Sequence, residues 1–202
     1  MFRLLVGIVA MSATPWKLEE NFRILESYVR EAATRRAQLV IAPESIIDDY
    51  MCAADPDTTR ERMLAAAQTV PDDPYLMRAR ALSRELGIYQ VISFPERAGE
   101  ELFNTCVLID PAGEIIARYS KAHPANESHI TPGCELRPFD APFGQAGFLI
   151  CSDRHYPDNF GVLGAQGVQV IYLPMDGWGG PENTRMRSIG SDDFSRRHGE
   201  SD

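Results

Sequence analysis

The sequence lacks the features that would direct it to a membrane or to nucleic acid. No stretch reaches the ~18 consecutive apolar residues that a membrane-spanning helix requires. No basic cluster is longer than two residues, and the formal net charge of −9 repels a phosphate backbone. We therefore expect neither a membrane nor nucleic acid among its partners.

The chain also lacks internal repeats, low-complexity tracts, heptad runs and any linker that would divide it. Its 202 residues, of which 44% are hydrophobic and 24% charged, are typical of one globular domain with its own core. Residues 2–10 form a short apolar run that an amphipathic helix follows. We interpret this run as a buried first strand and not as a secretory signal.

Cysteine is scarce, and its four copies show no CxxC spacing. Without a secretory signal, the simplest interpretation is that the thiols are reduced and that the protein is cytoplasmic. We expect Cys52 in an exposed loop, Cys106 within a strand and Cys134 beside a turn. The fourth, Cys151, stands where an apolar run meets a charged one in "GFLICSDRHYP".

What the sequence does contain is an alternation of strands and helices. Apolar residues recur at helical spacing and predict a helix packed on a sheet; they are Leu18, Phe22, Leu25, Val29 and Ala32. Near-continuous apolar runs predict buried strands at 37–45, 88–94 and 168–174. Further helices are predicted at 59–69, at 74–86 with Gly87 as the stop, and after Pro157.

Two segments in the second half predict hairpins. In 104–121 the turn residues lie around Asp110 to Gly113, and in 137–151 the bend is expected at Gly144 and Gln145. Strand–helix–strand units combined with hairpins predict an α/β protein whose sheets contain both parallel and antiparallel pairs.

Three side chains that could take part in catalysis follow apolar runs predicted as strands. Glu44 follows "LVIAP", Lys121 follows "IIARYS", and Cys151 follows "GFLI". Taken singly, each has an ordinary explanation, because charged residues at strand ends are often solvated and a cysteine is often a small core residue. Brought to one sheet edge, they would supply a base, an oxyanion clamp and a nucleophile.

The segments "IAPES", "YSKAHPANESHITPG" and "GFLICSDRHYP" resemble the glutamate, lysine and cysteine motifs of the nitrilase superfamily of carbon–nitrogen hydrolases, in the same order. The resemblance covers roughly residues 2–178. It implies an αββα sandwich of two mixed β-sheets with outer helical layers. It also implies that Glu44 is the general base, Lys121 the stabiliser of the tetrahedral intermediate and Cys151 the nucleophile, with no metal or cofactor.

The resemblance extends to supporting residues. It places the Ser152 backbone N–H in the oxyanion hole beside Lys121, and it matches Glu127 to a glutamate that orients the lysine or substrate. A solvated loop carboxylate is the alternative for Glu127. Asp153 and Arg154 match a polar pair after the nucleophile, and we expect them to form a local ion pair.

Departures from the family pattern bear on substrate and length. Nitrile-hydrolysing members usually carry Trp-Glu after the cysteine, whereas Ser152-Asp153 stands here, which favours amides or N-carbamoyl compounds. Members also usually continue with further strands and a helix. We therefore expect a C-terminally incomplete hydrolase domain at 1–178 and an irregular or mobile tail at 179–202, where apolar periodicity is almost absent.

Three rival interpretations remain open. A Cys–His hydrolase would use His155, although such pairs generally meet across a fold. A metal site would use His123, His129 and Cys134, whose spacing fits no common zinc pattern. The third is a truncated, inactive fragment or an interaction module that retains a helical dimer face.

The preferred interpretation is a cysteine-dependent amidase that forms a thioester and works on a small amide or carbamoyl substrate, within a homo-oligomer. Because Glu44 and Lys121 are expected at strand ends and outside the core, Glu44→Gln and Lys121→Ala are expected to abolish turnover while leaving the fold largely intact. We also expect Lys121 to lower the pKa of the Cys151 thiol, which Glu44 opposes.

Overall fold

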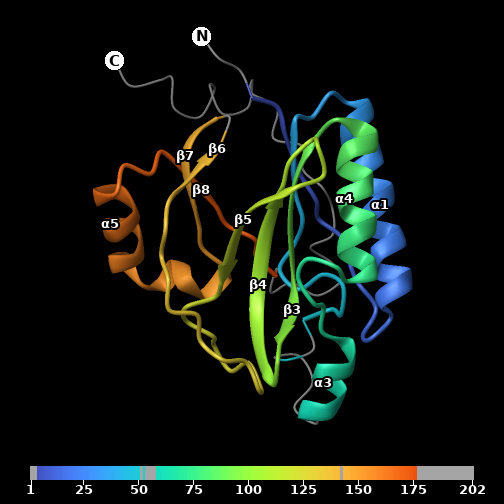
Figure 1. The fold of residues 1–202 in the computed structure, drawn as a ribbon, viewed down its shortest axis with the longest axis vertical. Coiled ribbons are helices and arrows are strands. Elements are labelled where there is room, and N and C mark those ends of the chain that lie inside the picture. Colours follow the sequence, from blue (N-terminus) through green and yellow to red (C-terminus); the bar gives the residue numbers. More distant parts are fainter. Residues whose placement is uncertain (1–3, 51, 53–57, 142, 177–202) are drawn as a thin grey trace, which may run out of the picture.

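A computed structural model describes residues 4–50, 52, 58–141 and 143–176. Two β-sheets pack face to face, and helices cover their outer faces (Figure 1). The sheets each contain parallel and antiparallel pairs, as the sequence predicts.

The larger sheet has five strands in the order β1-β2-β3-β4-β5. They are β1 (Val6–Ile8), β2 (Leu39–Ile41), β3 (Tyr89–Ala98), β4 (Glu101–Ile109) and β5 (Ile115–Ser120). The first three run parallel, and β3, β4 and β5 form an antiparallel meander. The predicted turn between β4 and β5 is confirmed, because the Asp110 side chain accepts hydrogen bonds from the backbone N–H groups of Ala112 and Glu114.

The smaller sheet has three strands in the order β6-β7-β8. They are β6 (Phe139–Ala141), β7 (Gly144–Phe148) and β8 (Val170–Tyr172). The predicted bend at Gly144 and Gln145 is displaced, because these residues already pair with Ala141 and Asp140 inside the ladder. Gly144 has a φ of 118°, which only glycine adopts readily, and therefore begins the strand after the bend.

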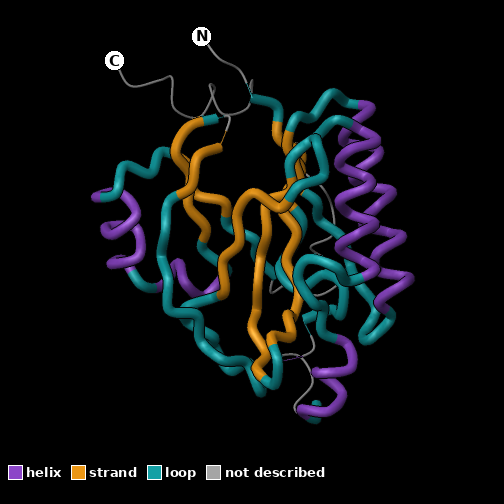
Figure 2. Tube along the Cα trace, viewed as in Figure 1, coloured by secondary structure: helices purple, strands orange, loops and turns teal. Residues whose placement is uncertain are grey.

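Helices form the two outer layers. The described helices are α1 (Leu18–Thr34), α3 (Arg60–Ala66), α4 (Pro74–Leu86), the 3-10 helix η1 (Cys151–His155) and α5 (Pro157–Ala165). The first and third of these, α1 and α4, lie along the outer face of the five-stranded sheet, and α5 lies outside the three-stranded sheet (Figures 1 and 2). This arrangement confirms the αββα sandwich.

Capping residues explain why α4 begins and ends where predicted. Asp73 accepts a hydrogen bond from the Tyr75 N–H, Pro74 opens the helix, and Gly87 closes it with a φ of 66°. The predicted helix at 59–69 ends early, at Ala66. Gln68 instead forms an isolated bridge to Glu96 of β3, and this pairing requires extended backbone.

Two apolar cores separate the layers. Between the helices and the five-stranded sheet lie the stripe residues of α1, the inner face of α4 and the outward side chains of β2 to β4. Between the two sheets lie Leu39, Val91 and Leu108 of one sheet against Phe148 and Tyr172 of the other. The second core is the layer at whose edge the candidate catalytic residues meet.

The first strand differs from its prediction. It spans Val6–Ile8 and is only partly covered, with Ile8 74% exposed. The strand lies at the edge of the five-stranded sheet, and the three strands of the other sheet do not extend over Ile8. On the face toward the other sheet, Val6 is partly buried against the inter-sheet core, whereas Val9, just after the strand, is buried in the core beneath the helices.

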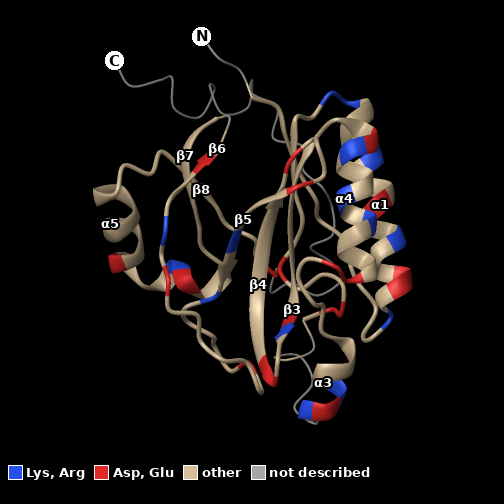
Figure 3. Ribbon diagram, viewed as in Figure 1, with Lys and Arg blue, Asp and Glu red and all other residues tan. Residues whose placement is uncertain are grey.

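Charged side chains of both signs lie along α1 and α4 (Figure 3). Arg30 pairs with Glu85 and Arg78 with Glu19, so that ion pairs link these two helices. Ion pairs as exposed as these contribute little to stability, because solvent screens them. None of the helices in the described part of the chain combines the length and apolarity needed to span a bilayer.

Candidate active site

A cluster of buried charges lies where β2 and β5 end. Lys121 directly follows β5, and its ammonium donates hydrogen bonds to Glu44 Oε1 at 2.6 Å, to Glu127 Oε1 and to the Tyr50 hydroxyl at 3.2 Å. Lys121 and Glu44 are 0% and 1% exposed. The alternative of solvated strand ends is therefore wrong for both, and so is a solvated loop position for Glu127, which is also buried.

The charges in this cluster do not cancel. Two carboxylates face one ammonium, so the ionised cluster carries one excess negative charge in a desolvated place. Burial by itself lowers the pKa of Lys121, but the charges of Glu44 and Glu127 more than offset this and raise it. Lys121 therefore stays protonated, with all three of its N–H donors occupied.

Neutral donors complete the coordination of the two carboxylates. The Asn104 amide on β4 donates to Glu44 Oε1 at 2.8 Å and to Glu127 Oε2 at 3.0 Å. The Tyr50 hydroxyl donates to Glu127 Oε1 at 2.8 Å, and its pKa is raised by burial and by both carboxylates, so it remains a donor. The Asp176 N–H reaches Glu44 Oε2 at 3.2 Å.

The backbone between Glu44 and Tyr50 is strained. Ser45, Asp49 and Tyr50 have φ values of 45°, 69° and 54°, a region that side chains other than glycine seldom occupy. This segment turns sharply at the end of β2. As a result, Glu44 and Tyr50 both point to the same ammonium.

Cys151 stands at a second strained point. Its φ is 38°, the backbone N–H donates to Pro174 O at 3.0 Å, and η1 begins at this residue. A positive φ at a non-glycine residue directly after an apolar strand is the geometry of a nucleophile elbow. The Arg154 guanidinium approaches the thiol, with Nη1 at 3.7 Å from Sγ.

The thiol is protonated at neutral pH. Burial, the charge of Glu44 and hydrogen bonding to Glu44 raise the pKa of Cys151 to about 11, and Lys121 and Arg154 only partly oppose this. The expected directions of Lys121, which lowers this pKa, and of Glu44, which raises it, are confirmed, but burial is the largest effect and makes the net shift upward. About one thiol in ten thousand is ionised at pH 7, so attack requires a base, and Glu44 is the group in contact.

Asp153 ties the elbow to the lysine loop. Its buried carboxylate accepts hydrogen bonds from the Tyr119 hydroxyl at 2.7 Å and from the backbone N–H groups of His123 and Ile150, each at 2.9 Å. It also lies 2.9 Å from the His123 ring, while Arg154 faces Cys151 and Met175. The predicted Asp153–Arg154 ion pair is therefore wrong, because the two side chains point to different partners.

Ser152 is also anchored to that loop. Its hydroxyl donates to His123 O at 2.5 Å, so the residue is held against the segment that carries Lys121. The elbow and the lysine loop are thus joined by two side chains, Ser152 and Asp153. This fixes the position of the Ser152 backbone next to Cys151.

The rival sites are not assembled. His155 is exposed, and the Cys151 thiol instead contacts the side chains of Glu44 and Arg154. Among the three residues of the rival metal site, His123 contacts Asp153, His129 lies 3.0 Å from Thr58 O, and Cys134 is exposed. The described residues contain no group of three potential metal ligands.

Cys52 also differs from its prediction. It is buried, and its Sγ lies 4.0 Å from Glu127 Oε2, so it is a neighbour of the cluster and not an exposed competitor. Cys106 is buried on β4, and Cys134 is the exposed thiol of the four.

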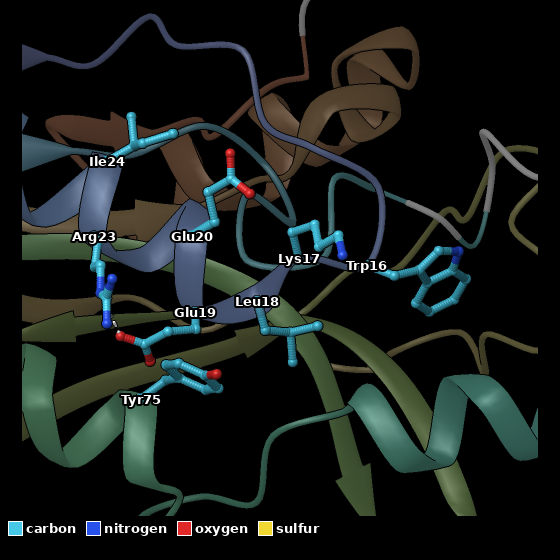
Figure 4. A pocket seen from close by; sticks show the side chains of 8 residues that line it. All are labelled: Trp16, Lys17, Leu18, Glu19, Glu20, Arg23, Ile24 and Tyr75. Carbon is cyan, nitrogen blue, oxygen red and sulfur yellow. Dashed lines mark hydrogen bonds and ion pairs between the residues drawn. The ribbon is translucent and has the colours of Figure 1, made fainter.

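A surface hollow of about 850 Å³ lies elsewhere, at the start of α1 (Figure 4). Trp16, Arg23 and Tyr75 are among its lining residues, and Arg23 pairs there with Glu19. None of its lining residues belongs to the catalytic cluster. We therefore do not assign it to the chemistry of Cys151.

Sequence reasoning missed Asn104 and Tyr50. A lone asparagine in the apolar strand "LFNTCVLI" is a signal, because asparagine is depleted in strands and a buried amide needs partners. Tyr50 gave no comparable signal. Its partners, Lys121 and Glu127, lie 71 and 77 residues further along the chain.

Comparisons with known proteins agree with this geometry. The profile of the carbon–nitrogen hydrolase family matches residues 5–191. A nitrilase from Pyrococcus abyssi is 30% identical over 172 residues, which cover 84% of this chain and 63% of that protein. An N-carbamoylputrescine amidase from Arabidopsis thaliana is 27% identical over 164 residues, which cover 78% of this chain and 54% of that protein.

A solved structure supports the fold. An amidase from Nesterenkonia sp. superposes with a TM-score of 0.72 at 24% identity, over 88% of this chain and 66% of that one. In a mutant of a Nesterenkonia sp. AN1 amidase, the acetamide moiety of fluoroacetamide is covalently added at the active-site cysteine. The present chain spans between about half and two thirds of the length of the curated relatives described above.

Proposed function

Because this chain belongs to the carbon–nitrogen hydrolase family, we propose that it is a cysteine-dependent hydrolase of non-peptide carbon–nitrogen bonds in amides or N-carbamoyl compounds. The observation that carries the proposal is the contact of Glu44 with both the Lys121 ammonium and the Cys151 thiol. These are the base, the cation and the nucleophile that acyl transfer needs.

The first half of the reaction forms a thioester. Glu44 takes the proton of the Cys151 thiol, and the sulfur attacks the carbonyl carbon of the substrate. Negative charge develops on the carbonyl oxygen, which the Lys121 ammonium and the Ser152 backbone N–H stabilise. Glu44 then gives its proton to the leaving nitrogen, the carbon–nitrogen bond breaks, and ammonia or an amine departs.

The second half releases the acid. Glu44 takes a proton from water, the resulting hydroxide attacks the thioester carbon, and the carbon–sulfur bond breaks. The proton on Glu44 returns to the Cys151 sulfur. One water is consumed for each carbon–nitrogen bond broken, and each step uses side chains of this chain and water.

Lys121 must release a partner to bind the oxyanion. Its three donors are already used by Glu44, Glu127 and Tyr50. The contact with Tyr50 is longer than that with Glu44 and involves a neutral acceptor, so exchange for the substrate oxygen costs least there. Glu127 keeps its contact and orients the ammonium throughout.

The test is turnover of a panel of simple amides and N-carbamoyl compounds by the full chain, with products separated by liquid chromatography. Rapid acid quench during turnover should trap an acyl group on the peptide that contains Cys151, and Cys151→Ala should trap none. Turnover retained by Cys151→Ala would contradict the thioester mechanism. A folded chain that turns over no member of the panel would favour the inactive fragment or interaction module.

Homo-oligomer formation and a cytoplasmic location remain proposals. Support for the first is the exposed apolar surface around α5, where Tyr156, Phe160 and Val162 are each more than two fifths exposed. Apolar side chains gathered on one helix are typical of a surface that another protein covers.

A further inference from the structure

We infer that Asn104 is a positioning residue that holds Glu44 and Glu127 on the Lys121 ammonium. The inference rests on the proposed function, because it concerns the same site and assigns a residue that none of the three sequence motifs contains. Asn104 lies in the middle of β4 and is 1% exposed.

Three members of the cluster meet at this one residue. The Asn104 side-chain nitrogen donates hydrogen bonds to the carboxylates of Glu44 and Glu127. The Asn104 backbone carbonyl accepts one from the backbone N–H of Lys121 at 2.8 Å. The carboxylates come from segments 60 residues before and 23 residues after Asn104 in the chain. Asn104 is therefore the point on the rigid sheet to which both loop carboxylates are fixed.

The chemistry of the amide fixes its orientation. An ionised carboxylate only accepts hydrogen bonds, so the NH₂ group must face Glu44 and Glu127, with the carbonyl on the other side. There the Ser93 hydroxyl lies 3.4 Å from Asn104 Oδ1. Rotation of the amide would place its carbonyl against two carboxylates, and the surrounding polar groups exclude this.

Charge explains why a neutral donor suits this position. The cluster already carries one excess negative charge, and a second cation there would neutralise the base that must accept the thiol proton. Asn104 compensates the carboxylates by hydrogen bonding without adding charge, which favours their ionised form. A neutral donor thus leaves Glu44 able to take the thiol proton in the first half of the proposed reaction and a proton of water in the second.

Other titratable groups also face the two carboxylates, from the segment after β2, from the loop after β5 and from the start of η1. They are Tyr50, Cys52, Lys121 and Cys151, and Asp48 and Arg154 in turn act on Cys52 and Cys151. Cys106, on β4 itself, also lies near Glu44. All of them are unchanged when Asn104 is replaced, so a shift in the pH profile of the variant reports the lost amide.

The experiment measures Cys151 alkylation by fluoroacetamide and amide turnover, each as a function of pH, in the full chain. Asn104→Leu removes the hydrogen-bond donor that favours the ionised carboxylates. The acid limb of each profile, where the rate falls as the pH is lowered, should therefore move to higher pH by about one to two units. Asn104→Asp keeps the shape of the side chain but presents a carboxylate, and the same upward movement is expected. Circular dichroism and thermal melting establish that each variant is folded.

Gln90→Leu is the matched control. Gln90 is a buried amide on β3 that donates to Ala79 O at 2.9 Å and to Ser83 Oγ at 2.7 Å, away from the cluster. Its loss should lower the melting temperature and leave the acid limb in place. A folded Asn104 variant whose acid limb coincides with that of Gln90→Leu would overturn the inference.

The two readouts separate this inference from the proposed function. If the unaltered chain is alkylated at Cys151 but turns over no amide, the proposed function fails while the alkylation profile still decides the role of Asn104. If it turns over amides and neither profile moves in the variants, the role of Asn104 fails alone.

Discussion

Replacing Lys121 with methionine should destabilise the fold strongly, because the substitution leaves two buried carboxylates without their cation. The ammonium contacts Glu44 at 2.6 Å and also Glu127, and the side chains of all three residues are 0% exposed. This contradicts the basis of the expectation that substitution of Glu44 or Lys121 leaves the fold intact. Both side chains lie inside the protein, although they follow strand ends in the sequence.

The magnitude follows from the burial. Removing one partner of a buried ion pair costs about 3–5 kcal/mol, and a whole domain has a free energy of unfolding of about 5–15 kcal/mol. For a chain of this size, that loss lowers the melting temperature by about 6 to 20 °C. Methionine keeps most of the apolar stem, so the loss reflects the uncompensated charge and not a cavity.

The assay is urea unfolding and thermal melting of Lys121→Met beside two further variants. Lys17→Met is the control, because Lys17 is the only other lysine and is exposed. The triple variant Lys121→Met, Glu44→Gln, Glu127→Gln removes all three charges. It should be more stable than Lys121→Met alone, because no buried charge is then left unpaired.

The pH dependence has a definite sign. Without the ammonium, folding of Lys121→Met favours proton uptake by Glu44 or Glu127, so the native state binds more protons than the unfolded chain. The stability deficit should therefore shrink as the pH falls toward ~4, where free glutamate is protonated. A Lys121→Met variant as stable as Lys17→Met, or a triple variant less stable than the single one, would refute this account of the cluster.

Two other outcomes test the nucleophile and the assembly. Because the Cys151 thiol has a pKa of about 11, its attack on an amide needs a base, so Glu44→Gln should lower amide turnover by about a hundredfold or more, while exposed Cys134 is alkylated by iodoacetamide at an unchanged rate, as peptide mapping would report. Turnover equal to that of the unaltered chain would mean that another group is the base. If the surface around α5 joins copies of the chain, light scattering after gel filtration should give a mass that is a multiple of 22.5 kDa for the unaltered chain and the monomer mass for Phe160→Asp. A monomeric unaltered chain would contradict the proposed homo-oligomer.

Local signals in the sequence predict those elements whose boundaries are set locally. The bounds of α4 follow from the Asp73 cap, the opening Pro74 and the closing Gly87, all within reach of the helix itself. The bend before β7 is predicted two residues late, because glycine marks a position that permits positive φ and not the centre of the turn. The burial of β1 depends on which of its residues the opposite sheet covers, and a local sequence pattern cannot predict this.

The candidate site divides in the same way. Glu44, Lys121 and Cys151 stand out because each is a reactive group directly after an apolar run, and family motifs surround them. The importance of Asn104 and Tyr50 depends on hydrogen-bond partners that lie far away in the sequence. The Asp153–Arg154 pair fails for the converse reason, since neighbours in sequence often point to opposite sides of the backbone.

The buried cluster also explains why the base and the lysine must be considered together. A glutamate that is to accept a proton from a thiol with a pKa of about 11 needs hydrogen-bond donors around it. Lys121, Asn104 and the Asp176 N–H provide such a surrounding for Glu44. In the proposed mechanism the same ammonium then faces the charge that moves from Glu44 through sulfur to the substrate oxygen. Lys121 would thus stabilise both ends of the charge transfer, and this role accounts for a buried ion cluster that apolar side chains would replace at little cost in stability.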